Sequence, residues 1–205
     1  VVFPLVAEAT FRDDVEVVRG YVRETLRATL VIAALPAALF SANAAEVLRL
    51  VYPPEYVAGA PALRIVAVGM LSFAVITVLT SVISSGGRPW VSVAIVSVTL
   101  ALDAGLNFAL IGSLGLAGAA TATTIAMFAG AAACVGFVGF RYGARLPVTS
   151  IARVALSAGA VYALSLLLPS DAVLERLGFG GLIVRVAVAA EFCLMGVVYL
   201  VALIA

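Results

Sequence analysis

Long apolar stretches alternate with short polar joints along most of the chain. A helix that crosses the hydrocarbon core of a bilayer needs about 20 mostly apolar residues. Six stretches meet this requirement, and we expect each to be a membrane-spanning helix: 28–45, 62–84, 90–111, 116–140, 151–168 and 182–205. No stretch shows the alternation of a β-strand. The pattern therefore predicts an all-α fold, a polytopic transmembrane helix bundle of about six spans.

The joints between these stretches contain the residues that end helices. Residues 85–89 read SGGRP and residues 112–115 read GSLG. Both are predicted to be tight turns, because Gly adopts unusual backbone angles and Pro readily starts the next helix. Residues 52–56 read YPPEY, where the prolines break a helix and the tyrosines suit the headgroup zone.

Residues 11–27 differ from the rest because they carry four acidic residues and four arginines. Their apolar residues, Val15, Val18, Val22 and Leu26, recur at helical spacing. We expect an amphipathic helix that lies on the cytoplasmic surface of the membrane. The chain then divides into three segments. These are the end of an earlier span with this amphipathic segment (1–27), a four-span core (28–140) and two further spans (141–205).

The arginines predict the orientation of the chain in the membrane. If successive joints fall on alternate sides, one side holds eight arginines: Arg12, Arg19, Arg23, Arg27, Arg88, Arg141, Arg145 and Arg153. The other side holds four: Arg49, Arg64, Arg176 and Arg185. The positive-inside rule places the richer side in the cytoplasm. We therefore expect a multi-pass protein of the inner (cytoplasmic) membrane whose two chain ends are cytoplasmic.

Composition supports a membrane protein and excludes several kinds of site. Hydrophobic residues make up 64% of the 205 residues and charged residues 11%, against about 45–50% and about 25% in soluble domains. The chain has no His, hence no imidazole base and no His-bound metal. Cys134 and Cys193 lie apart in apolar runs and form no metal motif. The net charge of +1 gives no case for nucleic acid binding. We expect no catalytic residue, metal or cofactor.

Asp103 and Asn107 are the main candidate binding residues. Asp103 falls near the middle of the third apolar stretch, where a charge costs roughly 2.5–3.5 kcal/mol on translocon scales. Asn107 follows four residues later and shares its helix face. Such a pair is expected to face protein or a water-filled cavity. It binds a proton, a cation or substrate, or it forms a hydrogen-bonded contact between helices.

Two further charged residues are candidates for binding substrate or ions. Glu191 lies about two turns into the last stretch and is the second intramembrane carboxylate. Arg64 opens the second stretch on the outer side, where its side chain either reaches the headgroups or grips a phosphate.

Two features concern helix shape and packing. Pro36 lies inside the first span, where it removes a backbone hydrogen bond, so it is a candidate hinge. The fourth stretch is dense in Gly and Ala, which predicts that its backbone approaches other helices closely.

An ordered set of motifs resembles the polysaccharide flippases of the MATE-like MOP superfamily. Residues 47–60, VLRLVYPPEYVAGA, resemble the short outer loop that follows a helix in that family. Residues 84–89, SSGGRP, look like its small-residue, Gly and basic turn. Residues 107–123, NFALIGSLGLAGAATAT, resemble its Asn…Leu-Ile-Pro…Gly-Gly-Ala-Ala…Ala-Thr hairpin. Gly112 and Asp103 depart from the family, which often has Pro and Asn at these positions.

This resemblance implies a fold and a function. The chain would be the C-terminal lobe, spans nine to fourteen of about fourteen, and would work with an N-terminal lobe of the same protein. The two lobes would alternate between inward-open and outward-open states. The cargo would be a lipid-linked oligosaccharide or polysaccharide precursor. Membrane lipids would surround the protein.

Three alternatives remain open at this point. Within the superfamily, the cargo would instead be lipid II, or a drug or other small molecule. Outside it, a polytopic enzyme of polysaccharide assembly is the main alternative, although the outer loops are short and hold few carboxylates.

Overall fold

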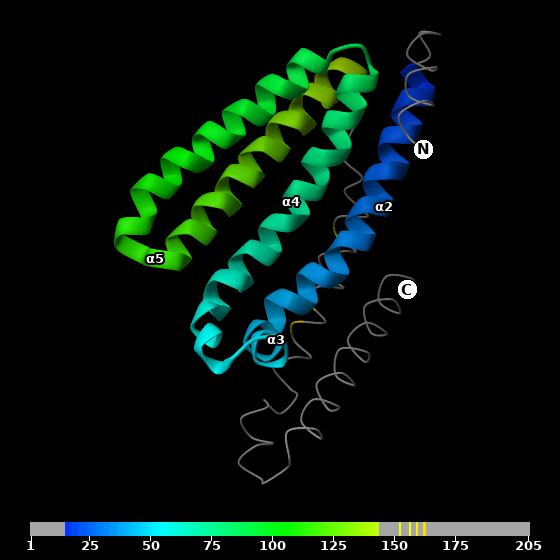
Figure 1. The fold of residues 1–205 in the computed structure, drawn as a ribbon. Helices are drawn as coiled ribbons and strands as arrows, with labels where there is room; N and C mark the ends of the chain where they lie inside the picture. Colours follow the sequence, from blue (N-terminus) through cyan, green and yellow to red (C-terminus); the bar gives the residue numbers. More distant parts are fainter. Residues whose placement is uncertain (1–14, 144–151, 153–155, 157–158, 160–161, 163–205) are drawn as a thin grey trace.

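The computed structural model describes residues 15–143 together with residues 152, 156, 159 and 162. In this part of the chain the order of elements is α2 (Val15–Ala42), α3 (Ala44–Val51), the short 3-10 helix η1 (Pro54–Gly59), α4 (Ala60–Ser85) and α5 (Pro89–Tyr142). Figure 1 shows that the long helices run side by side, with α4 between α2 and α5. The all-α prediction is confirmed for these residues.

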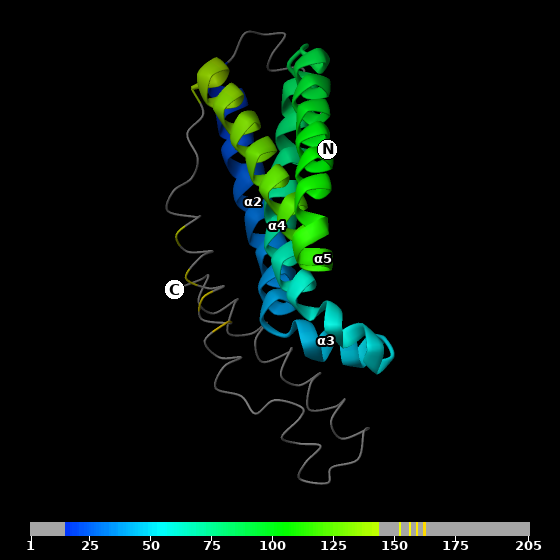
Figure 2. The ribbon, with the colours of Figure 1, turned by 90° about the vertical axis from the view of Figure 1, so that its left-hand side faces the viewer.

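The element α5 is a helical hairpin rather than one straight helix. Gly115 has φ 56° and ψ −132°, which interrupts the helical backbone. Figures 1 and 2 show that the chain doubles back there, so that a first arm (89–114) and a second arm (116–142) lie against each other. The hairpin confirms the turn predicted from the sequence GSLG and separates the predicted spans 90–111 and 116–140.

Among the described residues, α2, α4 and α5 are long and apolar enough to cross a membrane. Each arm of α5 has about 25 residues and is therefore roughly 38 Å long, enough for a bilayer core of about 30 Å. The helix α4 agrees closely with the predicted span 62–84. The spans expected at 151–168 and 182–205 lie outside the described residues.

The segment predicted as a surface helix is instead the first part of α2, which continues unbroken to Ala42. Its apolar stripe, Val18, Val22 and Leu26, is buried in a core that α4 and α5 complete. That core contains Val75, Ile76, Leu79, Val82, Ile83, Ala131, Cys134, Val138 and Tyr142. The expectation of a separate amphipathic surface helix was wrong because this stripe has a protein partner and does not need the headgroup layer.

One end of the bundle is joined by contacts around Tyr142. Arg19 donates from Nε to the Tyr142 carbonyl oxygen at 3.2 Å and forms an ion pair with Glu16 at 2.7 Å. The Tyr142 hydroxyl lies against Gly86, so closely that a Cβ at Gly86 would collide with it. The start of α2, the turn before α5 and the end of α5 therefore meet at one end. Arg88 and Arg141 belong to the same end, as the alternation of the spans predicted.

The opposite end contains the break predicted from YPPEY. The helix α3 ends at Val51, and η1 begins at Pro54. The rings of Tyr52 and Tyr56 lie 5.4 Å apart across this break. Figure 2 shows α3 projecting sideways from the long helices, as expected of a segment at a membrane interface.

Replacing Gly115 with Ala is expected to destabilise the hairpin by about 1–3 kcal/mol, because a Cβ disfavours this positive φ with extended ψ. Thermal unfolding of the purified protein in detergent measures the effect. The matched control is Gly105→Ala in the first arm, where a Cβ meets nothing within 4 Å. A Gly115→Ala protein as stable as the control would contradict this role for the glycine.

Candidate functional site

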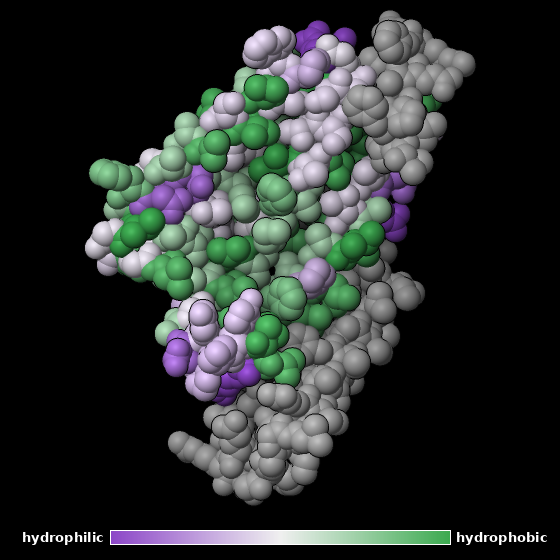
Figure 3. All heavy atoms as spheres, in the orientation of Figure 1, coloured by the Kyte–Doolittle hydropathy of each residue, from purple (hydrophilic) through white to green (hydrophobic). Residues whose placement is uncertain are grey.

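The first arm of α5 carries a pair of polar residues in a strongly apolar sequence. Asn107 donates from Nδ2 to Oδ1 of Asp103 at 2.9 Å and to the Asp103 carbonyl oxygen at 2.9 Å. The i, i+4 spacing places both side chains on one face of the helix. Both are half-buried. Figure 3 shows a small purple patch in a largely green surface on α5.

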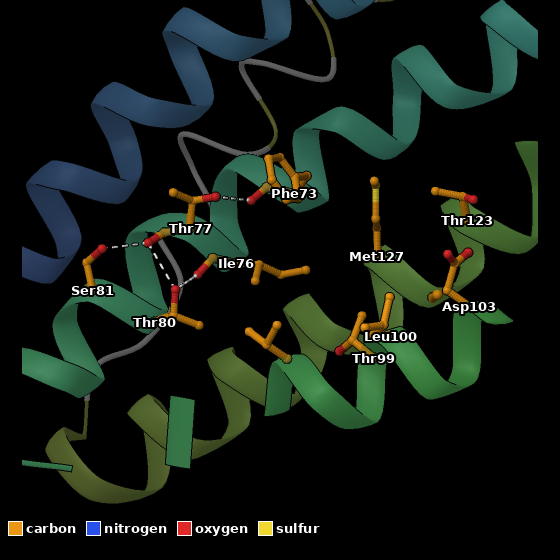
Figure 4. Close-up of a pocket in the computed structure, with 12 residues that line it drawn as sticks. Phe73, Ile76, Thr77, Thr80, Ser81, Thr99, Leu100, Asp103, Thr123 and Met127 are labelled. Carbon is orange, nitrogen blue, oxygen red and sulfur yellow. Dashed lines mark hydrogen bonds between the residues drawn. The ribbon is translucent and has the colours of Figure 1, made fainter. Parts of the chain in front are cut away.

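Asp103 lines a cavity of about 360 Å³ between α4 and the two arms of α5. Figure 4 shows the residues of all three helices around this space. The lining consists of Phe73, Ile76, Thr77, Thr80, Ser81, Val96, Thr99, Leu100, Asp103, Thr123, Ala126 and Met127. Asp103 is the only charged residue in the lining. The structure thus brings Asp103 and Asn107 together on one helix face and places Asp103 in the wall of an open cavity between α4 and α5.

Close packing beside the cavity depends on glycine. A Cβ at Gly130 would lie 2.5 Å from Thr99 Oγ1 and 3.0 Å from Ile76 Cδ1. Gly130 therefore lets the second arm approach α4 and the first arm at once. The small residues of the fourth predicted span have the packing role expected of them here.

Most hydroxyl groups in the lining donate to their own helix. Thr77 Oγ1 donates to the Phe73 carbonyl oxygen at 3.0 Å, Thr80 Oγ1 to that of Ile76 at 2.7 Å, and Thr99 Oγ1 to that of Ile95 at 2.8 Å. A hydroxyl has one proton and two lone pairs, so each oxygen still offers an acceptor site. Thr123 lies near Asp103 in Figure 4 and makes no hydrogen bond to another described residue.

The hydroxyl residues were not among the sequence candidates. Thr77, Thr80, Ser81 and Ser84 follow the spacing i, i+3, i+4, i+7, which places them on one face of α4. In the first arm, Thr99 precedes Asp103 by four residues. A search for polar stripes in the apolar helices would have found both sets.

The other candidate residues lie apart from this cavity. Arg64 is exposed on α4, is not part of the lining and forms no ion pair with another described residue. Pro36 is exposed inside α2, and the helix continues past it to Ala42. Glu191 lies outside the described residues.

The cavity suits a proton or a small monovalent cation better than an anion. Asp103 supplies one carboxylate, and the hydroxyls supply acceptor oxygens. The described residues contain no group of three His, Cys, Asp or Glu side chains. They therefore do not form the set of several charged ligands that a divalent metal ion prefers. The lining contains no Arg that would hold a phosphate.

Comparisons with known proteins identify one family. The family model described as "Lipid II flippase MurJ" matches residues 1–187. Among solved structures, "Lipid II flippase MurJ, inward closed conformation" matches 98% of this chain with a TM-score of 0.78 and 11% sequence identity. At this identity the structural likeness shows the fold alone. The chain spans 41% of the length of that flippase. No curated protein matches the sequence.

Replacing Gly130 with Ala is expected to destabilise the bundle by about 1–3 kcal/mol, because the new methyl group overpacks the junction beside the cavity. Thermal unfolding in detergent measures the loss. Gly136→Ala in the same arm is the control, because a Cβ there meets nothing within 4 Å. Equal unfolding temperatures for the two variants would show that the three helices do not depend on this close approach.

Proposed function

Since the chain belongs to the lipid II flippase MurJ family, we propose that it forms part of a transporter that moves lipid II across the cytoplasmic membrane. Members of this family are multi-pass membrane transporters and not enzymes. The match over residues 1–187 supports lipid II as the cargo in preference to the polysaccharide precursors of our first expectation. The resemblance to flippases was right at the level of the superfamily, and the alternative cargo is the one that the family match favours.

The transport mechanism we propose is alternating access between two lobes. This chain spans 41% of the solved flippase, so it would supply one lobe, and the remaining part of the transporter would supply the other. The close packing of α2, α4 and α5 suits a lobe that moves as a unit. Pro36 remains a proposed hinge within α2, because a proline inside a helix removes one backbone hydrogen bond.

The observation that supports the proposal for this lobe is the position of Asp103, a carboxylate in an apolar helix that lines an open cavity between α4 and α5. Charge at this depth is costly and is usually retained in transporters for ions or protons. We propose that Asp103 binds a small monovalent cation or a proton during the transport cycle. Asn107 would orient the carboxylate through its hydrogen bond to Oδ1.

Phosphate recognition would take place away from this cavity. The pyrophosphate of a lipid-linked cargo is anionic, and the acceptor oxygens and carboxylate of the lining disfavour it. Arg64, exposed near the start of α4, remains a proposed contact for a phosphate or a lipid headgroup. Arg19, Arg88 and Arg141 gather at the other end of the bundle, which we propose is the cytoplasmic end.

Replacing Asp103 with Asn in the intact transporter is expected to abolish the stimulation of lipid II translocation by an ion gradient. The variant keeps the shape of the side chain and loses the charge that binds a cation. Translocation in proteoliposomes is measured with a sodium gradient, with a pH gradient and with neither. Thermal unfolding checks that the variant remains folded.

The matched control is Glu55→Gln, the corresponding substitution at an exposed carboxylate in η1. It is expected to leave the ion dependence unchanged. If Asp103→Asn responded to both gradients like the wild type, the ion-binding role would be refuted.

A further inference from the structure

A second cavity continues the one beside Asp103. It has a volume of about 430 Å³ and is lined by Thr80, Ser81, Ser84, Ser92, Val93, Val96 and Ser97. Thr80, Ser81 and Val96 line both cavities, so the two form one groove between α4 and the first arm of α5. We call this the hydroxyl groove.

The hydroxyl groove reaches from one end of the bundle to about the middle of the first arm. Ser92 lies one turn after the start of α5 at Pro89, close to the turn that contains Gly86 and Arg88. From Ser92 to Asp103 the helix rises roughly 16 Å, about half the thickness of the hydrocarbon core. The groove therefore has the length needed to connect the membrane surface at this turn with Asp103.

Along the groove, three serine hydroxyl groups donate their protons to other protein oxygens, so they can only accept hydrogen bonds from water or bind a cation. Ser92 Oγ donates to the Thr80 carbonyl oxygen at 2.9 Å, and Ser84 Oγ donates to Ser92 Oγ at 3.0 Å. Ser81 Oγ donates to the Thr77 carbonyl oxygen at 2.9 Å. Each of these hydroxyls has used its one proton and still has a lone pair. Neither lining contains a basic residue, and the negative charge of Asp103 in the first one favours cations over anions.

The space is sufficient for water. A water molecule occupies about 30 Å³ in the liquid, so the two cavities, of about 360 Å³ and about 430 Å³, each have room for several water molecules. Water needs two to four polar partners, and the hydroxyl and backbone oxygens along α4 provide them. A hydrated small cation can keep part of its water shell while it moves along such a wall.

We propose that the hydroxyl groove is a hydrated path by which a small monovalent cation or a proton reaches Asp103 from the membrane surface at the turn of Gly86 and Arg88. This proposal rests on the proposed binding of a cation or a proton at Asp103 and adds the route and the side of entry. The groove takes no part in holding the lipid cargo.

Cysteine labelling of the intact transporter tests the path. Cys134 and Cys193 are first replaced with Ala, and single cysteines are introduced as Ser97→Cys and Ser81→Cys. The control is Val98→Cys, at nearly the same depth as Ser97, because Val98 is also exposed but lies outside both linings. Small membrane-impermeant thiol reagents, one cationic and one anionic, are added to the side of the turn.

Both groove cysteines are expected to react with the reagents. The cationic reagent should react about tenfold faster than the anionic one, because a cleft lined by one sign of potential concentrates the opposite charge. Val98→Cys is expected to react much more slowly with both reagents, because a side chain at this depth outside the groove would be surrounded by lipid or protein and not by water. Groove cysteines that react no faster than Val98→Cys, or that prefer the anionic reagent, would overturn the proposal.

Filling the groove gives a second, functional test. Ser97→Leu is expected to slow ion-stimulated translocation, because the larger side chain narrows the path. The equilibrium affinity for the ion that stimulates transport should not change, because Asp103 is intact. Val98→Leu is the control of equal depth and is expected to transport like the wild type. An unchanged rate in Ser97→Leu would refute the path.

The two proposals fail in different ways. If Asp103→Asn abolishes ion stimulation and the groove cysteines remain unlabelled, Asp103 binds the ion and the path is elsewhere. If Asp103→Asn retains ion stimulation, the proposed function of this lobe fails, whatever the labelling shows. Sodium and pH gradients, applied separately, identify which cation uses the path.

Discussion

The structure depends on the fact that polar groups in a hydrocarbon core must find their partners within the protein. Helices satisfy the backbone, and the side chains of the described residues follow the same rule. No side-chain nitrogen or oxygen buried among them lacks a hydrogen bond. Thr77, Thr80 and Ser81 of α4 donate to carbonyl oxygens one turn back, and Asn107 donates to Asp103. This constraint allows a groove with hydroxyl groups along its wall to exist in an apolar bundle, because those hydroxyl groups have hydrogen-bond partners before any ligand arrives.

Satisfied polar groups still need helices that approach closely, and small residues provide this. A Cβ at Gly69 would lie 2.8 Å from Thr124 Oγ1 and 3.2 Å from Thr124 Cα, so α4 and the second arm of α5 are in near-backbone contact there. Thr124 Oγ1 then reaches the Ile65 carbonyl oxygen at 3.2 Å. Gly130 has the same role beside Thr99. Since lipid provides no hydrophobic drive between helices, such contacts and interhelical hydrogen bonds hold the bundle.

Among the described residues, the sequence predicted α4 and the two arms of α5 closely, because membrane thickness and the turn residues set their length and ends. The span 62–84 and the hairpin at Gly115 follow directly from hydropathy and glycine. The position of residues 15–27 could not be predicted in this way. The stripe of Val18, Val22 and Leu26 is equally suited to a headgroup layer and to a protein core, and only the presence of Leu79 and Val138 beside it decides between them. Asp103 could be recognised from the sequence because a charge in lipid has a high free-energy cost. The hydroxyl groups around it have a low free-energy cost in lipid, so only their spacing along the helices marks them.

The chemistry of the cavity bears on how the proposed transporter would separate ion binding from cargo binding. A lipid-linked pyrophosphate needs cationic groups, and the lining around Asp103 offers a carboxylate and acceptor oxygens instead. Under the cation binding proposed for Asp103, this site would act on the cargo indirectly, through the conformation of the lobe that contains it. Asp103 lies between the α5 hairpin and α4, so neutralising its charge changes the electrostatic free energy at the contact between those helices. A cation that binds one conformation of this contact more tightly than another shifts the balance between them by that difference in affinity. The ion and the cargo would then be coupled through helix packing, without sharing a single ligand.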